Sequence, residues 1–202
     1  FESFRPTIPE SYRKAPFLFL GNIQPDLQLD VLDQMKKPRL VLCDTMNYWI
    51  TSQPERLEKV FRRSHVICVN DAEARMFTGK SSLPKAAQEL LKLGPQRVII
   101  KLGGYGVHLY GRDSFFALPA LPLTNVKDPT GAGDTFAGGF IGRLTTAVRL
   151  NENAFRRALA VGTVMASFCV QDFSCRRTAI LRPADIKKHL QSLRRAVLLP
   201  HI

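Results

Sequence analysis

The sequence predicts an α/β fold with a mostly parallel sheet, and three observations predict it. Between Phe17 and Lys101, short apolar segments alternate with amphipathic ones. The apolar segments show no alternation of polar residues, which is typical of parallel strands covered by helices on both sides. From Gly103 onward, short strand-like segments separated by turn residues indicate an antiparallel edge. We therefore expect three layers, with a sheet between two layers of helices.

The first half of the chain can be assigned element by element from its periodicity. Strands are expected at 17–22, 39–44, 65–70 and 97–103, and helices at 26–35, 54–63, 71–79 and 82–94. Asp26 and Ser82 are expected to cap helices, and Pro54 to open one. Gly79 and Gly94 are expected to end helices, because glycine readily follows the last helical turn.

The second half is mostly helical in pattern. Strands are expected at 106–111 and 114–119, followed by helices at 131–149, 151–168 and 183–196. In the first of these helices, apolar side chains recur at helical spacing, which predicts a buried stripe. The glycines of the same helix, Gly138, Gly139 and Gly142, are expected to allow close packing.

Composition is that of an ordinary globular protein, with 45% hydrophobic and 23% charged residues in 202. This length suits one domain, and we expect 1–202 to form a single domain. No apolar run is long enough to cross a bilayer. The chain begins with Phe1 rather than Met, so it is expected to be a piece of a longer protein or a processed product.

The cysteines and histidines show no metal-ligand spacing. Cys43 and Cys68 lie inside apolar strand-like segments, where a free cysteine behaves as a small hydrophobic residue. Neither CxxC spacing nor a pairing of His with Cys or an acid is present, which argues against a zinc site or a disulfide framework. A reducing cytoplasm is the expected location.

The net charge of +12 requires an explanation. Basic doublets occur at 62–63, 156–157, 176–177, 187–188 and 194–195. Such a charge attracts polyanions, including nucleic acid, acidic membranes and phosphorylated small molecules. The doublets are spread over several helices without interleaved aromatic residues, which favours solvated helix faces around an anion site over nucleic-acid binding.

The segment 128–140, DPTGAGDTFAGGF, places a glycine-rich turn directly before a predicted helix. Such a turn presents unpaired backbone N–H groups and the positive end of the helix dipole, which together form an anion site. Asp134 would lie in the first helical turn. It can serve as a base that accepts a proton from an attacking hydroxyl, or simply as an acid favoured by the dipole. The residues alone leave both interpretations open.

The same segment resembles the signature D-T-x-G-A-G-D-x-F of the ribokinase/PfkB carbohydrate kinase family, with Asp128-Pro129-Thr130 in place of Asp-Thr. The resemblance implies a ribokinase-like fold. It also implies that Gly131, Ala132 and Gly133 form an anion hole, that Asp134 is the catalytic base and that Thr130 contacts ATP.

Two further segments agree with the family, in its order. VNDAEARMFTG resembles the N-x-x-E segment, which implies that Asn70 and Glu73 organise Mg²⁺ and phosphate through water. IIKLGGYGVHLY resembles the strand-loop-strand beside the ATP site. The residues that this match implies to lie at ATP are Lys101, Gly103, Gly104 and Gly106.

The predicted helix at 151–168 would flank adenine, by the same resemblance, with Gly162 and Ala166; alternatively these small residues serve only to pack a buried helix. The following FCVQDFSC departs from the Gly-Ala ending common in sugar kinases. A K⁺ site near this segment is therefore left open.

The resemblance covers nearly the whole chain but only the C-terminal two-thirds of the family. The Gly-Gly substrate motif and the β-sheet lid of the family precede this part, so the chain alone is expected to be weakly active or inactive. LCDTMNYWI lies where a central strand ends. Asp44 and Asn47 are therefore candidates for the acceptor side of the active site, although Asp44 can equally cap a loop.

Taken together, the sequence predicts an ATP-dependent phosphotransferase that acts on a hydroxyl of a sugar or nucleoside, with Mg²⁺ as cofactor. The alternative is a non-catalytic nucleotide-binding or interaction protein on the same fold. The expected partners are ATP and a small acceptor, with neither nucleic acid nor a membrane, and a homodimer is an open expectation for the full-length protein.

Overall fold

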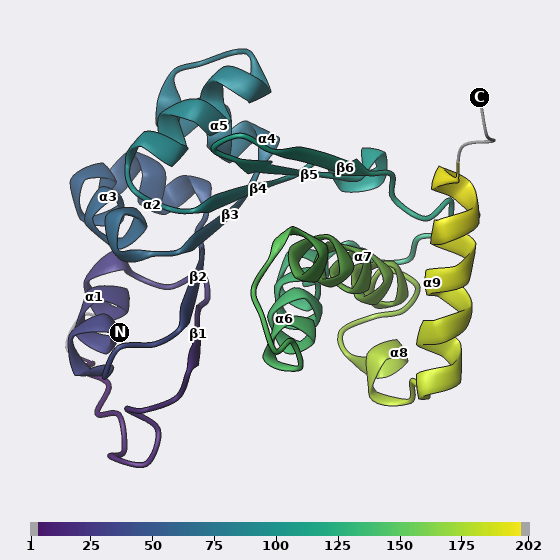
Figure 1. Cartoon of the computed structure of the whole chain (residues 1–202), viewed down its shortest axis with the longest axis horizontal. Coiled ribbons are helices and arrows are strands. Elements are labelled where there is room, and N and C mark those ends of the chain that lie inside the picture. The colour runs from purple at the N-terminus through teal and green to yellow at the C-terminus, as the bar shows by residue number, and fades with distance from the viewer. Residues whose placement is uncertain (1–3, 199–202) are drawn as a thin grey trace. The chain divides into compact units, whose positions relative to one another are not determined.

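The computed structural model describes residues 4–198, within which six strands form one sheet in the order β1-β2-β3-β4-β5-β6 (Figure 1). Phe1, where the chain begins, lies outside the described residues. The strands are β1 Phe17–Leu20, β2 Leu40–Asp44, β3 Val66–Asn70, β4 Arg97–Lys101, β5 Val107–Gly111 and β6 Phe115–Leu118. All six expected strands are present, shorter by up to two residues at some ends.

The sheet is parallel where the expected alternation is found and antiparallel beyond it. β1 pairs with β2 and β2 with β3 in parallel, with Phe17 opposite Leu40 and Leu42 opposite Val66. The connections from β4 to β5 and from β5 to β6 span only residues 102–106 and 112–114. Connections this short cannot cross over to a parallel neighbour, so these two pairs are antiparallel.

The helices agree with the sequence where the apolar periodicity is long. Helices are α1 Pro25–Gln34, α2 Asn47–Ser52, α3 Pro54–Arg63, α4 Asp71–Thr78, α5 Leu83–Lys92, α6 Ala132–Thr145, α7 Glu152–Cys169, α8 Arg176–Ala179 and α9 Pro183–Val197, with a 3₁₀ turn η1 at Gly103–Tyr105. The short elements α2, α8 and η1 were not expected. Asp26 lies in the first turn of α1, whereas Gln24 occupies the cap position, so the expected Asp26 cap is wrong. No helix in the described part of the chain combines the length and the apolar character needed to cross a membrane.

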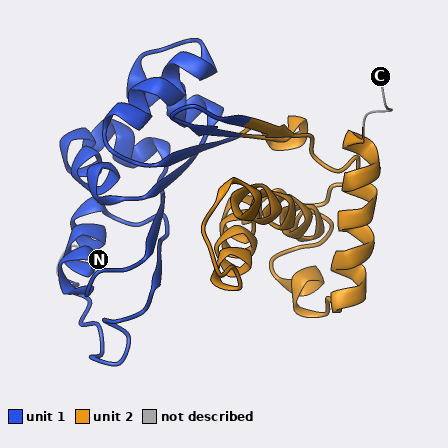
Figure 2. Cartoon of the chain, in the orientation of Figure 1, with its two compact units in different colours: residues 1–100, 109–115 blue, residues 101–108, 116–202 orange. Residues whose placement is uncertain are grey.

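The chain divides into two compact units (Figure 2). Unit 1 runs up to Ile100 and includes Leu109–Phe115; unit 2 comprises Lys101–His108 and the chain from Phe116 onward. The expectation of a single domain stays a prediction.

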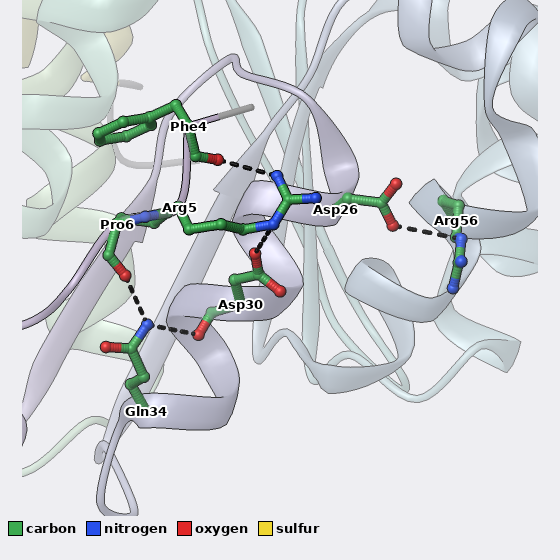
Figure 3. Close-up of polar contacts among 7 residues, drawn as sticks. All are labelled: Phe4, Arg5, Pro6, Asp26, Asp30, Gln34 and Arg56. Atoms are coloured by element: carbon green, nitrogen blue, oxygen red, sulfur yellow. Dashed lines mark hydrogen bonds and ion pairs between the residues drawn. The ribbon is translucent and has the colours of Figure 1, made fainter. Parts of the chain in front are cut away.

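Unit 1 has its core around the parallel strands. All five residues of β2 are buried, including Asp44, and four of the five residues of β3 are buried. Polar contacts attach the segment before β1 to α1, and they attach α1 to α3 (Figure 3). Gln34 donates to the carbonyl of Pro6 at 2.8 Å, and Arg56 pairs with Asp26 at 3.2 Å. The Arg56–Asp26 pair is largely exposed, so the apolar core, and not this pair, contributes most of the stability.

Unit 2 is built on the packing of α6 against α7. Phe136, Phe140 and Phe155 are buried in it. A Cβ at Gly139 would lie 2.9 Å from Cγ of Met165, and one at Gly162 would lie 2.8 Å from the carbonyl oxygen of Phe136. These two glycines therefore allow the helices to approach closely. A Cβ at Gly138 or Gly142 would meet nothing within 4 Å, so close packing was wrongly expected of those two.

Candidate active site

A pocket of about 470 Å³ lies within unit 2, in the size range of small-molecule sites. Four segments of the unit line it: the end of β4 with the turn after it, the segment that follows β6, the start of α6 and one face of α7. Its lining residues are Lys101, Gly103, Gly104, Gly106, Val107, Ala120, Leu121, Pro122, Leu123, Val126, Pro129, Ala132, Gly133, Phe136, Thr163, Ala166, Ser167 and Val170. The walls are thus mostly apolar, with backbone and one cation at the glycine-rich end.

The start of α6 forms the glycine-rich end of this pocket. Gly131 occupies the cap position at φ 78° and ψ 2°, in the left-handed region that favours glycine, and no side chain caps the helix. The Ala132 amide donates to Pro129 at 3.2 Å. Among the described residues, the amides of Gly133 and Asp134 have no hydrogen-bond acceptor. Open amides at the positive end of a helix dipole are suited to an anion.

Lys101 brings a positive charge to the same place. Its Nζ lies 3.2 Å from the point where a Cβ of residue 133 would be, so a larger residue there would displace the ammonium by a few tenths of an ångström. A cation beside the N-terminus of a helix is electrostatically unfavourable by itself. An anion such as a phosphate between the ammonium and the amides would interact favourably with both.

Gly106 closes the turn that follows β4. Its φ of 112° lies in the region that favours glycine. A Cβ at this position would also lie only 2.0 Å from the carbonyl oxygen of Leu118, so no residue other than glycine fits. The turn therefore presents its backbone, rather than side chains, to the pocket, together with Gly103 and Gly104.

Backbone contacts hold the loop before α6 against the end of α7. The Lys127 amide donates to the carbonyl of Val170 at 2.8 Å, and Sγ of Cys169 donates to the carbonyl of Thr130 at 3.6 Å. Within the loop, the Thr130 amide donates to Oδ1 of Asp128 at 2.9 Å. This bond, with a weaker one from the Thr130 hydroxyl, lowers the pKa of the Asp128 carboxyl. Cys169 thus contacts this loop, which the sequence did not indicate.

The structure brings most of the residues predicted to contact ATP into one pocket. Lys101, Ala132, Gly133, Ala166 and the glycines of the 103–106 turn line it. Thr130, Gly131 and Asp134 adjoin these residues in the chain without lining the pocket, and Asp134 is exposed in the first turn of α6. Gly162 is buried against Phe136 in the α6–α7 packing.

Three lining residues in or directly after α7 were missed: two in α7 and Val170, which directly follows it. Thr163, Ser167 and Val170 lie at helical spacing from Ala166, so the periodicity of the helix was a signal that could have found them. The hydroxyl of Thr163 donates to the carbonyl of Leu159 at 2.9 Å, and that of Ser167 to Val164 at 2.7 Å. The O–H donor of each hydroxyl is therefore used within the helix, and its oxygen can still accept.

In unit 1, Asn70 and Glu73 form the capping box of α4 directly after β3. Oδ1 of Asn70 accepts from the Glu73 amide at 2.7 Å, and Oε2 of Glu73 accepts from the Asn70 amide at 2.7 Å. Glu73 is buried. Carboxylate and carboxamide oxygens can each accept more than one hydrogen bond, and a metal-bound water is a suitable donor to them.

Asp44 and Asn47 lie at the end of β2 and the start of α2. Asp44 is 4% exposed, and its Oδ1 accepts from the Thr45 amide at 2.8 Å. A contact of this kind is what the loop-capping alternative for Asp44 predicts. Asn47 is exposed.

Comparison with known proteins adds to this geometry. A family model described as pfkB family carbohydrate kinase matches residues 11–180. A cytidine kinase from Thermococcus kodakarensis is 35% identical over 138 residues, which cover 66% of this chain and 49% of that protein. A 2-dehydro-3-deoxygluconokinase from Thermoproteus tenax is 27% identical over 175 residues, which cover 87% of this chain and 46% of that protein. The chain spans about half the length of these relatives.

Solved structures are similar as well. A ribokinase from Thermotoga maritima gives a TM-score of 0.69 at 25% identity, covering 87% of this chain and 56% of that one. An aminoimidazole riboside kinase from Salmonella enterica, complexed with aminoimidazole riboside and an ATP analog, gives 0.73 at 23% identity, covering 88% and 63%. The expected fold, ribokinase-like with a mostly parallel sheet and an antiparallel edge, is confirmed.

Proposed function

The chain belongs to the pfkB family of carbohydrate kinases, and we propose that the protein transfers a phosphoryl group from ATP to a hydroxyl of a sugar or nucleoside. The observation that carries this proposal is the pocket of unit 2. There the open amides at the start of α6 and the ammonium of Lys101 converge beside apolar walls. Such a combination suits a nucleotide, which has an apolar base and a charged phosphate chain.

In this proposal the amides of the segment from Gly131 to Gly133 stabilise the charge on the transferring phosphoryl group. Asp134, in the next position, accepts the proton of the attacking hydroxyl as the new O–P bond forms and the bond from the γ-phosphorus to the bridging oxygen breaks, which releases ADP. Lys101 offsets phosphate charge, and the face of α7 around Ala166 contacts the adenine. These roles follow the family motif, residue by residue.

Mg²⁺ is the proposed cofactor, and it would neutralise charge on the phosphates. Asn70 and Glu73 offer the oxygen ligands that suit a metal ion which keeps several of its waters. Their capping box fits a role through water better than direct coordination, because Oδ1 of Asn70 and Oε2 of Glu73 each already accept a backbone N–H. Among the similar structures, a putative ribokinase II from E. coli is in complex with ATP and Mg²⁺.

The remaining expectations belong to the same proposal. Asp44 and Asn47 face the acceptor, the two units act as one kinase domain, and the protein is cytoplasmic, with a homodimer and a K⁺ site left open. A protein that binds ATP without transferring phosphate would instead support the non-catalytic alternative.

Calorimetry with MgATP on the folded chain tests the proposal through a matched pair of variants. Gly133→Asp puts a carboxylate where the phosphates would bind, while Gly138→Asp puts the same charge at an exposed position of α6 with open space around it. At nucleotide concentrations up to about 1 mM, we expect binding by the parent and by Gly138→Asp, and at least about tenfold weaker binding by Gly133→Asp. Equal binding by both variants, or no binding by the folded parent, would contradict the proposal.

A further inference from the structure

Unit 1 contains a second cleft, of about 300 Å³, at the carboxyl ends of two parallel strands. Its lining residues are Asn22, Ile23, Gln24, Met46, Tyr48, Trp49 and Gln53. The first three follow β1, and the other four belong to the segment after β2. In open α/β sheets, the crevice at the carboxyl ends of the strands is where ligands bind.

Exposed rings and apolar side chains surround this cleft. Tyr48 is 58% exposed, and Ile23 and Met46 are more than a third exposed. The Tyr48 ring meets the Trp49 ring edge-on, with centroids 4.8 Å apart. The indole N–H of Trp49 donates to Oδ1 of Asn22 at 3.0 Å, which fixes the orientation of the indole. A cluster of apolar and aromatic side chains beside a concave surface is typical of a binding site for a flat ligand.

The polar part of the cleft consists of carboxamides. Among the described residues that line it, none carries a charge. Gln53 contributes to the lining, and its Oε1 is buried without a hydrogen-bond partner in the described part of the chain. A carboxamide can donate and accept at once, which matches the N–H and ring-nitrogen pattern on the edge of a nucleobase.

We propose that this cleft binds the base of a nucleoside, with the ring stacked on Tyr48 and the base edge at the amides of Gln53 and Gln24. This rests on the proposed function and narrows the acceptor class from sugar or nucleoside to nucleoside. The carboxamides can also bond to the hydroxyls of a bare sugar, but a puckered sugar ring covers an aromatic face less completely than a planar base does. A neutral planar base uses both the ring and the amides.

Trp49 allows a direct test, because it is the only tryptophan of the chain and lies in the cleft. Cytidine, adenosine, ribose and fructose are titrated against the intact chain without ATP, with indole fluorescence as the readout. We expect a saturable change with a nucleoside and at least about tenfold weaker binding of the sugars. Ribose binding as tightly as a nucleoside, or a signal unmoved by either nucleoside, would overturn the assignment.

A variant pair locates the binding. Tyr48→Leu removes the stacking ring, and Tyr12→Leu removes a similarly exposed ring that does not line the cleft. Nucleoside affinity should fall about tenfold or more in the first and stay unchanged in the second. Equal affinity in both would overturn the proposal.

If Tyr48→Leu does not fold, the unmodified chain can be tested instead. A bound nucleoside should then reduce the quenching of Trp49 fluorescence by acrylamide. Quenching that falls with rising protein concentration, rather than with added nucleoside, would show that a second copy of the chain covers the cleft. That result would also overturn the assignment. Binding of MgATP, which the proposed function assigns to the pocket of unit 2, is measured separately by calorimetry on the same intact chain. Its loss with nucleoside binding intact would refute the proposed function, while the reverse result would refute only this inference.

Discussion

The starts of α4 and α6 are built in opposite ways. At α4, Asn70 and Glu73 bond reciprocally to each other's amides, so the helix start is satisfied by its own side chains. At α6, Gly131 offers no side chain, the amides of Gly133 and Asp134 lack acceptors among the described residues, and a lysine ammonium lies close by. The comparison separates a helix start that stabilises the fold from one that is available to a ligand.

The energetic consequence differs accordingly. A side-chain cap contributes about 0.5–2 kcal/mol to the free energy of unfolding. The start of α6 forgoes that contribution and adds a cation at the unfavourable end of a dipole. Local departures from the most stable choice are expected where a site serves function.

The largest effect that this comparison predicts is on catalysis. Asp134→Asn keeps the shape of the first turn of α6 but removes the proposed proton acceptor. In a form of the protein that carries the acceptor-binding part of the family, kcat should fall by roughly 10²–10⁴, with ATP affinity retained or slightly increased.

A melting curve of the same variant separates the alternative role of Asp134. If the carboxylate only interacts with the helix dipole, the free energy of unfolding falls by about 0.3–1 kcal/mol while kcat stays nearly unchanged. That pattern would remove Asp134 from the mechanism.

The next effect is on stability, at the capped helix. Asn70→Ala should lower the free energy of unfolding by about 1 kcal/mol, measured by urea denaturation. Asn151→Ala is the matched control, because Asn151 caps α7 by accepting from the Ala154 amide at 3.0 Å. If Asn70 also organises Mg²⁺, only Asn70→Ala weakens MgATP binding. Equal MgATP binding by the two variants would restrict Asn70 to its cap.

The sequence predicts the strands and the long helices because burial imposes a period on their residues. It misses α2 and α8, which have six and four residues, because elements this short hardly exceed one turn and show no period. It misplaces the cap of α1 because Pro25 already provides the first helical residue, which moves the cap position to Gln24.

For the candidate site, the sequence indicates the backbone features better than the surrounding side chains. Gly131 and Gly133 are recognisable because a glycine-rich turn before a helix has a physical use. The proximity of Lys101 to Gly133 depends on a strand end and a helix start that are 32 residues apart in the chain, which no local pattern encodes. Likewise, only the packing of α7 shows that Gly139 touches a neighbour and Gly138 does not.

The smallest expected effect concerns how acid acts on the two helix starts. His65 precedes the strand that leads into α4; its Nδ1 accepts from the Val41 amide at 3.0 Å, and burial lowers its pKa. The unfolded chain therefore takes up this proton first, so the contribution of neutral His65 is complete above pH about 6.5 and is lost as the pH falls through the lower folded pKa. The loop before α6 depends instead on Asp128, whose pKa is lowered by the bonds from Thr130. Its contribution is lost only below pH about 3.9.

We expect His65→Gln, whose amide oxygen can still accept from Val41, to flatten the decline of the urea midpoint between pH about 7 and about 5. An unchanged decline in this variant would show that another group causes the acid sensitivity in that range.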